Sequence, residues 1–133
     1  MNFNKYQELA QRTDNINTPR NEMESERALT NSALGVCGES GEFADIVKKI
    51  YHQGHEFTED MQYKMIEELG DILWYVAKAA RVLGCSMEYV AVLNIDKLKK
   101  RYPEGFDAER SKKRVPTFCE EGSESIYTGR DMK

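Results

Sequence analysis

Two acidic residues, Glu39 and Glu42, fall on or beside the apolar side of a helix predicted within residues 22–53. With successive residues about 100° apart around a helix, that side is formed by Val36, Phe43, Ile46, Val47 and Ile50. Glu39 lies inside this arc and Glu42 lies at its edge. Because an ionised carboxylate is costly to bury without a partner, these positions predict that something neutralises the pair.

A second acidic pair, Glu68 and Asp71, borders the apolar side of a helix predicted for residues 58–83. That side is formed by Met65, Ile66, Leu69, Ile72, Leu73, Val76 and Leu83. The apolar arc widens toward Glu68, Asp71 lies just beyond it, and Glu67 points elsewhere. Their angles around the helix therefore place Glu68 next to the apolar side and its neighbour Glu67 away from that side.

A spacing of three residues places the two carboxylates of each pair about one helical turn apart. If the two helices pack face to face, the two pairs converge. An all-oxygen, anionic cluster suits Mg²⁺ or Mn²⁺, which often bind substrate phosphates as well as protein. The pattern therefore predicts a divalent-metal site between the two helices.

Other interpretations compete with a magnesium site. The acids could be solvated and paired with nearby lysines, namely Lys48, Lys49, Lys64 and Lys78. A di-iron carboxylate site expects Glu-x-x-His pairs, and neither His52 nor His55 has a glutamate three residues earlier, which excludes that site. The two histidines could themselves bind a metal, although a solvated loop is the simpler interpretation.

The elements that must position these residues are all predicted to be helices. Helical spacing of apolar residues covers residues 4–13, 22–53, 58–83 and 87–101. Asn4 and Thr58 are the expected caps of the first and third helices, and Pro103 follows the end of the fourth. No stretch has the alternation of a strand, so the fold class is all-α, a four- to five-helix bundle.

Glycines occur inside the second predicted helix and at the expected ends of the second and third helices. Gly35, Gly38 and Gly41 each weaken a helix interior, so the second helix is expected to be broken. Gly54 and Gly84 are placed to end the second and third helices. The two helices that carry the acidic pairs are thus expected to be joined by a short connection.

Length and charge limit the classes of function. The chain of 133 residues has room for one domain, expected at residues 1–109, with residues 110–133 as a tail or arm without sustained periodicity. The net charge of −4 gives no general affinity for nucleic acid or an anionic membrane. No apolar run could span a bilayer, so a cytoplasmic protein without a membrane partner is expected. Cys37, Cys85 and Cys119 lack the spacing of a zinc site or a disulfide framework.

The acidic motifs in residues 38–42 and 67–71 resemble the Glu-x-x-Glu and Glu-x-x-Asp motifs of the MazG-type all-α nucleoside triphosphate pyrophosphohydrolases. The resemblance runs from residue 34 to residue 106 and includes the Lys-Arg-Tyr-Pro run at residues 100–103. In order and separation the motifs match small, single-domain phage and bacterial members. One position departs from many relatives, which have a further glutamate where this chain has Gly38.

The resemblance implies hydrolysis of a nucleoside or deoxynucleoside triphosphate to the monophosphate and pyrophosphate, with Mg²⁺ as cofactor, Mn²⁺ as a substitute and nucleotide-pool house-cleaning as the role. It implies that the catalytic metal ligands are Glu39, Glu42, Glu68 and Asp71. Near the triphosphate it implies Asn94, Lys97, Arg101 and Tyr102. It also implies a homodimer or homotetramer, as does the difficulty of building a deep site in so small a chain. The alternative is a non-catalytic nucleotide-sensing or protein-interaction module on the same scaffold.

Aromatic residues are further candidates for contact with a nucleotide base, although they could also belong to the core or to a subunit interface. Trp74 and Tyr75 could stack on a base, but aromatics at helical spacing are more often core or subunit-interface residues. Tyr6 and Gln7 could reach a base from the first helix, and the sequence does not choose between them.

Overall fold

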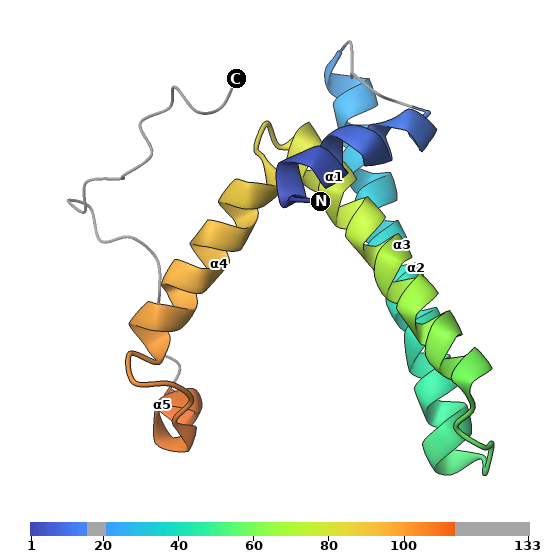
Figure 1. Ribbon diagram of the computed structural model, residues 1–133. Coiled ribbons are helices and arrows are strands. Elements are labelled where there is room, and N and C mark those ends of the chain that lie inside the picture. The colour runs from blue at the N-terminus through green and yellow to red at the C-terminus, as the bar shows by residue number, and fades with distance from the viewer. Residues whose placement is uncertain (16–20, 114–133) are drawn as a thin grey trace. The chain divides into compact units, whose positions relative to one another are not determined.

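The computed structural model describes residues 1–15 and 21–113, and within them it is entirely helical (Figure 1). It contains five α-helices and one short 3₁₀ turn, with no strand in the described ranges. The predicted all-α class is therefore confirmed. The chain forms two compact units, residues 1–87 and residues from 88 onward.

The first unit is built on a hairpin of two long helices, α2 (Glu22–His52) and α3 (Glu59–Val82), which run antiparallel along each other (Figure 1). The expectation that the second helix is broken was wrong, because α2 continues for 31 residues through all three glycines. A glycine costs a helix interior about 1 kcal/mol relative to alanine, and packing of a long face against a neighbour outweighs that cost.

Gly35 shows why a glycine is useful inside α2. The ring of Tyr75 on α3 lies so close that a Cβ built on Gly35 would be 2.3 Å from its nearest ring atom. A Cβ built on Gly38 or Gly41 would meet nothing within 4 Å. Gly35 therefore admits the tyrosine ring between the helices, whereas the other two glycines face open space.

Both ends of the hairpin follow the sequence prediction. The Thr58 side chain caps α3 by accepting a hydrogen bond from the Met61 amide at 3.3 Å. At the other end Gly84 adopts a φ of 72°, and the Cys85 and Gly84 amides donate back to the carbonyls of Ala80 and Arg81. Gly54 likewise has a φ of 72° just after α2. The glycine stops predicted at these two positions are therefore confirmed.

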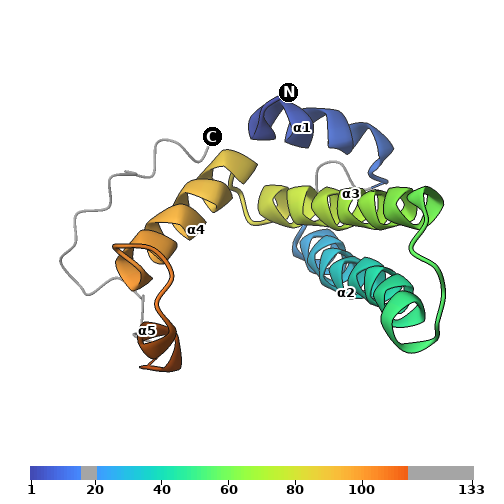
Figure 2. The same ribbon diagram turned by 60° about the horizontal axis from the view of Figure 1, so that its bottom comes forward.

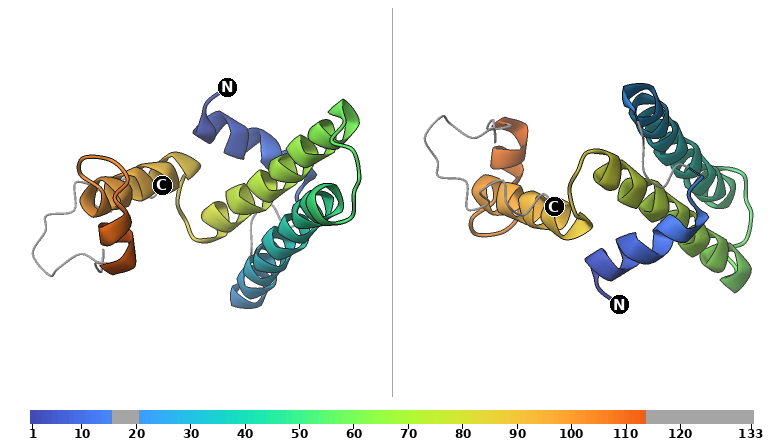
Figure 3. Two further views of the ribbon diagram at one scale, coloured as in Figure 1. Left: turned by 90° about the horizontal axis from the view of Figure 1, so that it is seen from below. Right: turned by 90° about the horizontal axis from the view of Figure 1, so that it is seen from above.

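The first helix, α1 (Phe3–Ala10), packs on the side of α3 that faces away from α2 (Figure 2). Its predicted cap was wrong: Asn2, not Asn4, accepts the Lys5 amide at 2.8 Å. The helix is also shorter than predicted, because residues Gln11–Thr13 form a 3₁₀ turn, η1. Views from below and above likewise show α3 between α1 and α2 (Figure 3).

The buried apolar core of the described residues is small: Ala28, Ala77, Ala80 and Met87. The last three form one cluster under α1, where Tyr6 and Ala10 pack against them. Several residues that were predicted to be buried on α3 are exposed, namely Ile66 at 57 %, Leu69 at 51 % and Leu83 at 64 %. Their predicted burial was wrong in the described part of the chain: the hydrogen bonds between α1 and α3 run from Gly70 to Ala77, after Ile66 and Leu69, and Leu83 follows the last residue of α3.

The second unit contains α4 (Met87–Arg101), which begins at the boundary, and α5 (Ala108–Lys113). The predicted fourth helix is confirmed, whereas α5 was not predicted because six residues give too little periodicity. Residues 110–113, expected to begin an irregular tail, are part of α5, and the rest of that tail lies outside the described residues. In the described part of the chain, no helix is long and apolar enough to cross a membrane.

Candidate functional site

Three of the four acidic residues singled out in the sequence meet between α2 and α3. Oxygen atoms of Glu39, Glu42 and Glu68 all lie within 4.8 Å of one another. Glu39 and Glu68 are half-buried, and Glu42 is exposed. The helical angles predicted this order, with Glu39 inside the apolar arc and Glu42 at its edge. We call these three residues the carboxylate cluster.

Asp71 lies one turn along α3 from the cluster and is not one of its three members. Its side chain is exposed, and its charge still acts on Glu68. Glu67, the neighbour of Glu68, is exposed and also outside the cluster. The structure therefore brings three of the four predicted residues together and leaves Asp71 at the edge.

The cluster is electrostatically unfavourable without a partner. The pKa of Glu68 is raised, first by partial loss of hydration and then by the negative charges of Glu42, Glu39 and Asp71. A hydrogen bond between the Glu68 and Glu39 carboxyl groups raises it further. Two carboxylates can share such a bond only if one holds a proton, so this arrangement requires a proton or a cation between them.

The lysines that could have neutralised these acids are engaged elsewhere. Lys48 and Lys49 pair with Asp45, and their hydrogen bonds lower the pKa of Asp45 to about 2. Lys64 pairs with Asp60 at 2.9 Å, and Lys78 pairs with Asp14 at 3.0 Å. Within residues 1–15 and 21–113, no member of the carboxylate cluster forms an ion pair. The pairing of these acids with nearby lysines, which the alternative interpretation expected, is therefore not found in the described part of the chain.

The donor set fits a hard divalent cation. All three members offer carboxylate oxygens, which Mg²⁺ and Mn²⁺ prefer over nitrogen or sulfur ligands. A cation between the carboxylates would offset their negative charge and take the place of the proton that a hydrogen bond between Glu39 and Glu68 requires. Neither histidine belongs to the cluster, and both are exposed.

The side of α3 that faces away from α2 is bordered by α1 (Figure 2). The Tyr6 hydroxyl lies 3.5 Å from the carbonyl oxygen of Gly70, next to Asp71 in the chain. Burial and the Asp71 charge raise the pKa of Tyr6. The sequence predicted that Tyr6 or Gln7 could reach a base from the first helix. Gln7 instead bonds the backbone of Ala77, Cys85 and Met87, which is an anchoring role.

A buried ion-pair network that the sequence did not predict fixes the chain at the end of η1, the turn that follows α1. Asp14 pairs with both Lys78 and Arg81, and Lys78 also donates to the Asn31 side chain at 2.8 Å. The side chains of Asp14 and Lys78 are 1 % and 2 % exposed. We call Asp14, Lys78, Arg81 and Asn31 the α1 clasp.

Trp74 belongs to the packing of α1 rather than to an open binding surface. Its indole nitrogen donates to the Ala10 carbonyl at 3.1 Å and to the Thr13 hydroxyl at 2.9 Å. The Lys78 ammonium lies 5.4 Å from its ring, and the Tyr75 ring packs edge-on at 4.9 Å. The contacts of Trp74 and Tyr75 therefore match a role in packing between helices rather than in stacking on a base.

The four residues expected near the triphosphate lie in the second unit. Asn94 and Lys97 are exposed on α4, and Arg101 ends that helix half-buried. Tyr102 follows directly and packs against Phe106 with ring centroids 5.6 Å apart. Arg110 on α5 donates to the Arg101 carbonyl at 3.3 Å, so α5 braces the end of α4.

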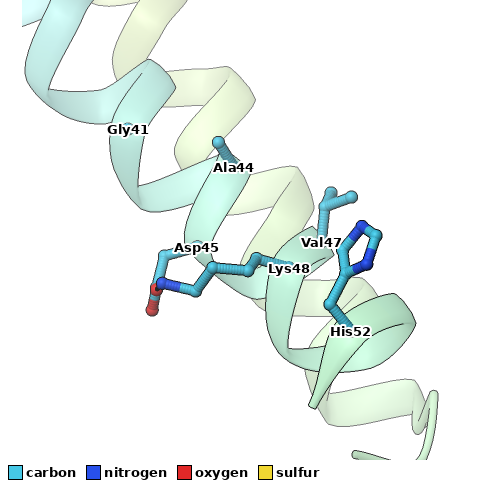
Figure 4. Close-up of a pocket in the computed structure, with 6 residues that line it drawn as sticks. All are labelled: Gly41, Ala44, Asp45, Val47, Lys48 and His52. Carbon is cyan, nitrogen blue, oxygen red and sulfur yellow. Dashed lines mark ion pairs between the residues drawn. The ribbon is translucent and has the colours of Figure 1, made fainter. Parts of the chain in front are cut away.

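A separate hollow on the surface of α2 offers little to a ligand. It is lined by Gly41, Ala44, Asp45, Val47, Lys48 and His52, all from this one helix (Figure 4). The Asp45–Lys48 ion pair spans its polar side. No member of the carboxylate cluster lines it, so the hollow is not the candidate site.

Comparison with known proteins identifies the family of the chain. It is similar to the Gene 37 protein of Mycobacterium phage L5, with 35 % identity over 83 residues, which are 62 % of this chain and 73 % of the phage protein. No solved structure gives a significant match. The profile of the MazG nucleotide pyrophosphohydrolase domain matches residues 27–106, a segment that contains α3, most of α2 and all of α4. The chain therefore belongs to the MazG nucleotide pyrophosphohydrolase domain family.

Proposed function

We propose that this chain is a Mg²⁺-dependent hydrolase that converts nucleoside or deoxynucleoside triphosphates to the monophosphate and pyrophosphate, with nucleotide-pool house-cleaning as its role. The observation that carries the proposal is the meeting of Glu39, Glu42 and Glu68 within 4.8 Å on two facing helices. All three lie in the segment that matches the family. Asp71 completes the proposed ligand set from the edge of the cluster.

The reaction assigns a task to each group of residues. Water attacks the α-phosphorus, the bond to the α–β bridging oxygen breaks, and pyrophosphate leaves with that oxygen. One carboxylate of the proposed set orients the water and accepts its proton. Glu39, Glu42, Glu68 and Asp71 would hold Mg²⁺, which when bound would neutralise charge on the phosphates and polarise the phosphoryl oxygen.

A triphosphate also needs positive charge to balance its own negative charge. Lys97 and Arg101 are four residues apart and share one side of α4. We propose that they contact the phosphates, with Asn94 and Tyr102 as further contacts. Arg101 is suited to this role because a guanidinium binds phosphate oxygens in a two-pronged geometry.

The proposed reaction is tested by incubating the purified chain with Mg²⁺ and a panel of ribo- and deoxyribonucleoside triphosphates. We expect equal amounts of monophosphate and pyrophosphate from the preferred substrates. Release of orthophosphate would place the cleavage at another bond. Nucleotide binding without turnover on any substrate would favour the alternative, a nucleotide-sensing module.

A matched pair of variants tests the carboxylate cluster. Glu68→Gln should lower turnover by about a hundredfold or more, because it removes a charged ligand from the cluster. Glu67→Gln is the control, since Glu67 is the adjacent residue, exposed and outside the cluster. Circular dichroism should show unchanged helix content for both variants. Equal loss of turnover in the two variants would contradict the assignment.

We also propose that the chain works as a homodimer or homotetramer. Tyr63, Ile66 and Leu69 form an exposed apolar stripe along α3, beyond the part that α1 covers. A chain of this length is expected to bury roughly two thirds of its unfolded surface, and the few buried apolar residues of the described part fall short of such a core. A second copy that covers the stripe would supply the missing contacts.

A further inference from the structure

The ring of Tyr75 lies directly against Gly35, so α2 and α3 approach each other closely at this point. The ring atoms nearest to a Cβ built on Gly35 are Cδ1, Cε1 and Cζ. They belong to the body of the ring, so rotation of the hydroxyl alone would not make room for a side chain. The Trp74 ring already packs edge-on against Tyr75, with ring centroids 4.9 Å apart. The close contact therefore depends on the absence of a side chain at residue 35.

The same sides of the two helices carry the carboxylate cluster. Because α2 and α3 are antiparallel, a step forward along one helix corresponds to an equal step back along the other (Figure 1). Steps of four and then three residues stay on one side of a helix. Counted in this way from the close contact, three levels follow one another: Gly35 with Tyr75, Glu39 with Asp71, and Glu42 with Glu68. The close contact is thus one helical turn from the first carboxylates.

A metal site between two helices tolerates little change in their spacing. Mg²⁺ holds its oxygen ligands at about 2.1 Å, so two oxygens on one ion are at most about 4.2 Å apart. The oxygens of the carboxylate cluster lie within 4.8 Å of one another, which is already near that limit. Both helices must therefore stay close for Glu39 and Glu68 to bind the same ion.

A methyl group at residue 35 would change this spacing. Two carbon atoms in contact are about 3.5 Å apart, whereas a Cβ on Gly35 would be 2.3 Å from the Tyr75 ring. The ring or the helix must then move by about 1 Å. A movement of that size one turn from the cluster opposes simultaneous coordination by carboxylates of both helices.

We propose that Gly35 is a positioning residue for the metal site: by admitting the Tyr75 ring, it lets α2 approach α3 closely enough for the carboxylate cluster to hold one divalent ion. This inference rests on the proposed function and deepens it, because it names what sets the distance between the two halves of the site. Gly35 itself touches neither the ion nor the substrate. Its contribution is to the spacing of the ligands.

The test is titration of the metal-free protein with Mn²⁺, read by calorimetry, for the wild type and Gly35→Ala at a temperature where both are folded. We expect the Mn²⁺ affinity of the variant to fall at least tenfold, as when a residue that orients a metal ligand is lost. Gly38→Ala is the matched control, because the same methyl group is added on the same helix and meets nothing within 4 Å. It should bind Mn²⁺ as the wild type does.

Two further variants separate positioning from a general loss of stability. Gly35→Ala combined with Tyr75→Leu removes the overlapping ring, so this double variant should recover the Mn²⁺ affinity that the single variant loses. Gln7→Ala removes three hydrogen bonds from α1, so it should lower the melting temperature and leave Mn²⁺ affinity unchanged. If Gly35→Ala does not fold, the double variant decides by the same titration.

The outcomes distinguish this inference from the proposed function. If Gly35→Ala binds Mn²⁺ as the wild type does, or if Gln7→Ala loses as much affinity, the positioning role is wrong while the proposed function stands. The same holds if the folded double variant does not regain affinity. If the wild type itself binds no Mn²⁺, both the proposed function and this inference fail.

Discussion

The three glycines of α2 look alike in the sequence but differ in what surrounds them. Gly35 leaves room for the Tyr75 ring, whereas Gly38 and Gly41 face open space beside the carboxylate cluster. The lack of a side chain is therefore required for packing at Gly35 only. At Gly38 the residue costs helix stability without a compensating contact in the described part of the chain.

This difference predicts opposite effects of the same substitution. Gly35→Ala should lower the free energy of unfolding by about 1–3 kcal/mol, because its methyl group overlaps the Tyr75 ring. Gly38→Ala should raise it by up to about 1 kcal/mol, because alanine is the better helix former. Urea unfolding followed by circular dichroism measures both. A destabilising Gly38→Ala would show that this side of α2 is covered in the native protein.

At the scale of elements, α1 and the turn after it are attached to α3 by polar contacts as well as by the small apolar cluster under α1. Asp14 receives two cations, Lys78 and Arg81, and its side chain is 1 % exposed. Trp74 contributes two further hydrogen bonds to the same end of α1. Buried charges do not by themselves stabilise a fold, but removal of one partner leaves the others uncompensated. Asp14 is therefore the residue on which the attachment depends most.

Asp14→Asn should lower the free energy of unfolding by about 3–5 kcal/mol, since Lys78 would stay buried without its countercharge. Trp74 is the single tryptophan of the chain, so its fluorescence reports the docking of α1. We expect a red-shifted emission in the variant as water reaches the indole. Asp45→Asn is the control, because Asp45 also binds two lysines but on the surface of α2. A loss of stability of similar size in both variants would contradict the conclusion that the buried ion pairs of the α1 clasp hold α1 on α3.

At the scale of the whole molecule, the sequence predicted the helices and the cluster better than it predicted the contacts between helices. Helical angle alone placed Glu39 and Glu68 inward and Glu67 outward, because that geometry is local. The unbroken α2 and the burial of Lys78 depend on partners distant in the sequence. Angle also predicted burial for Ile66, which requires a covering element that residues 1–15 and 21–113 of one chain do not supply.

Ile66 therefore provides the test of the proposed oligomer. It lies at the centre of the apolar stripe between Tyr63 and Leu69, and it is 57 % exposed. Light scattering coupled to size exclusion should give a multiple of the 15.3 kDa chain mass for the wild type. Ile66→Glu should give the chain mass itself, because burying an unpaired charge in the interface would cost more than the association supplies.

Leu83→Glu is the matched control for this experiment. Leu83 is as exposed as the stripe, at 64 %, but it lies at the end of α3, away from Tyr63, Ile66 and Leu69. A single exposed leucine requires no partner, so this variant should keep the wild-type mass. A monomeric wild type would contradict the oligomer, and an oligomeric Ile66→Glu would move the interface away from the stripe. The pair of glutamate variants therefore decides whether the apolar stripe on α3 is where the copies meet.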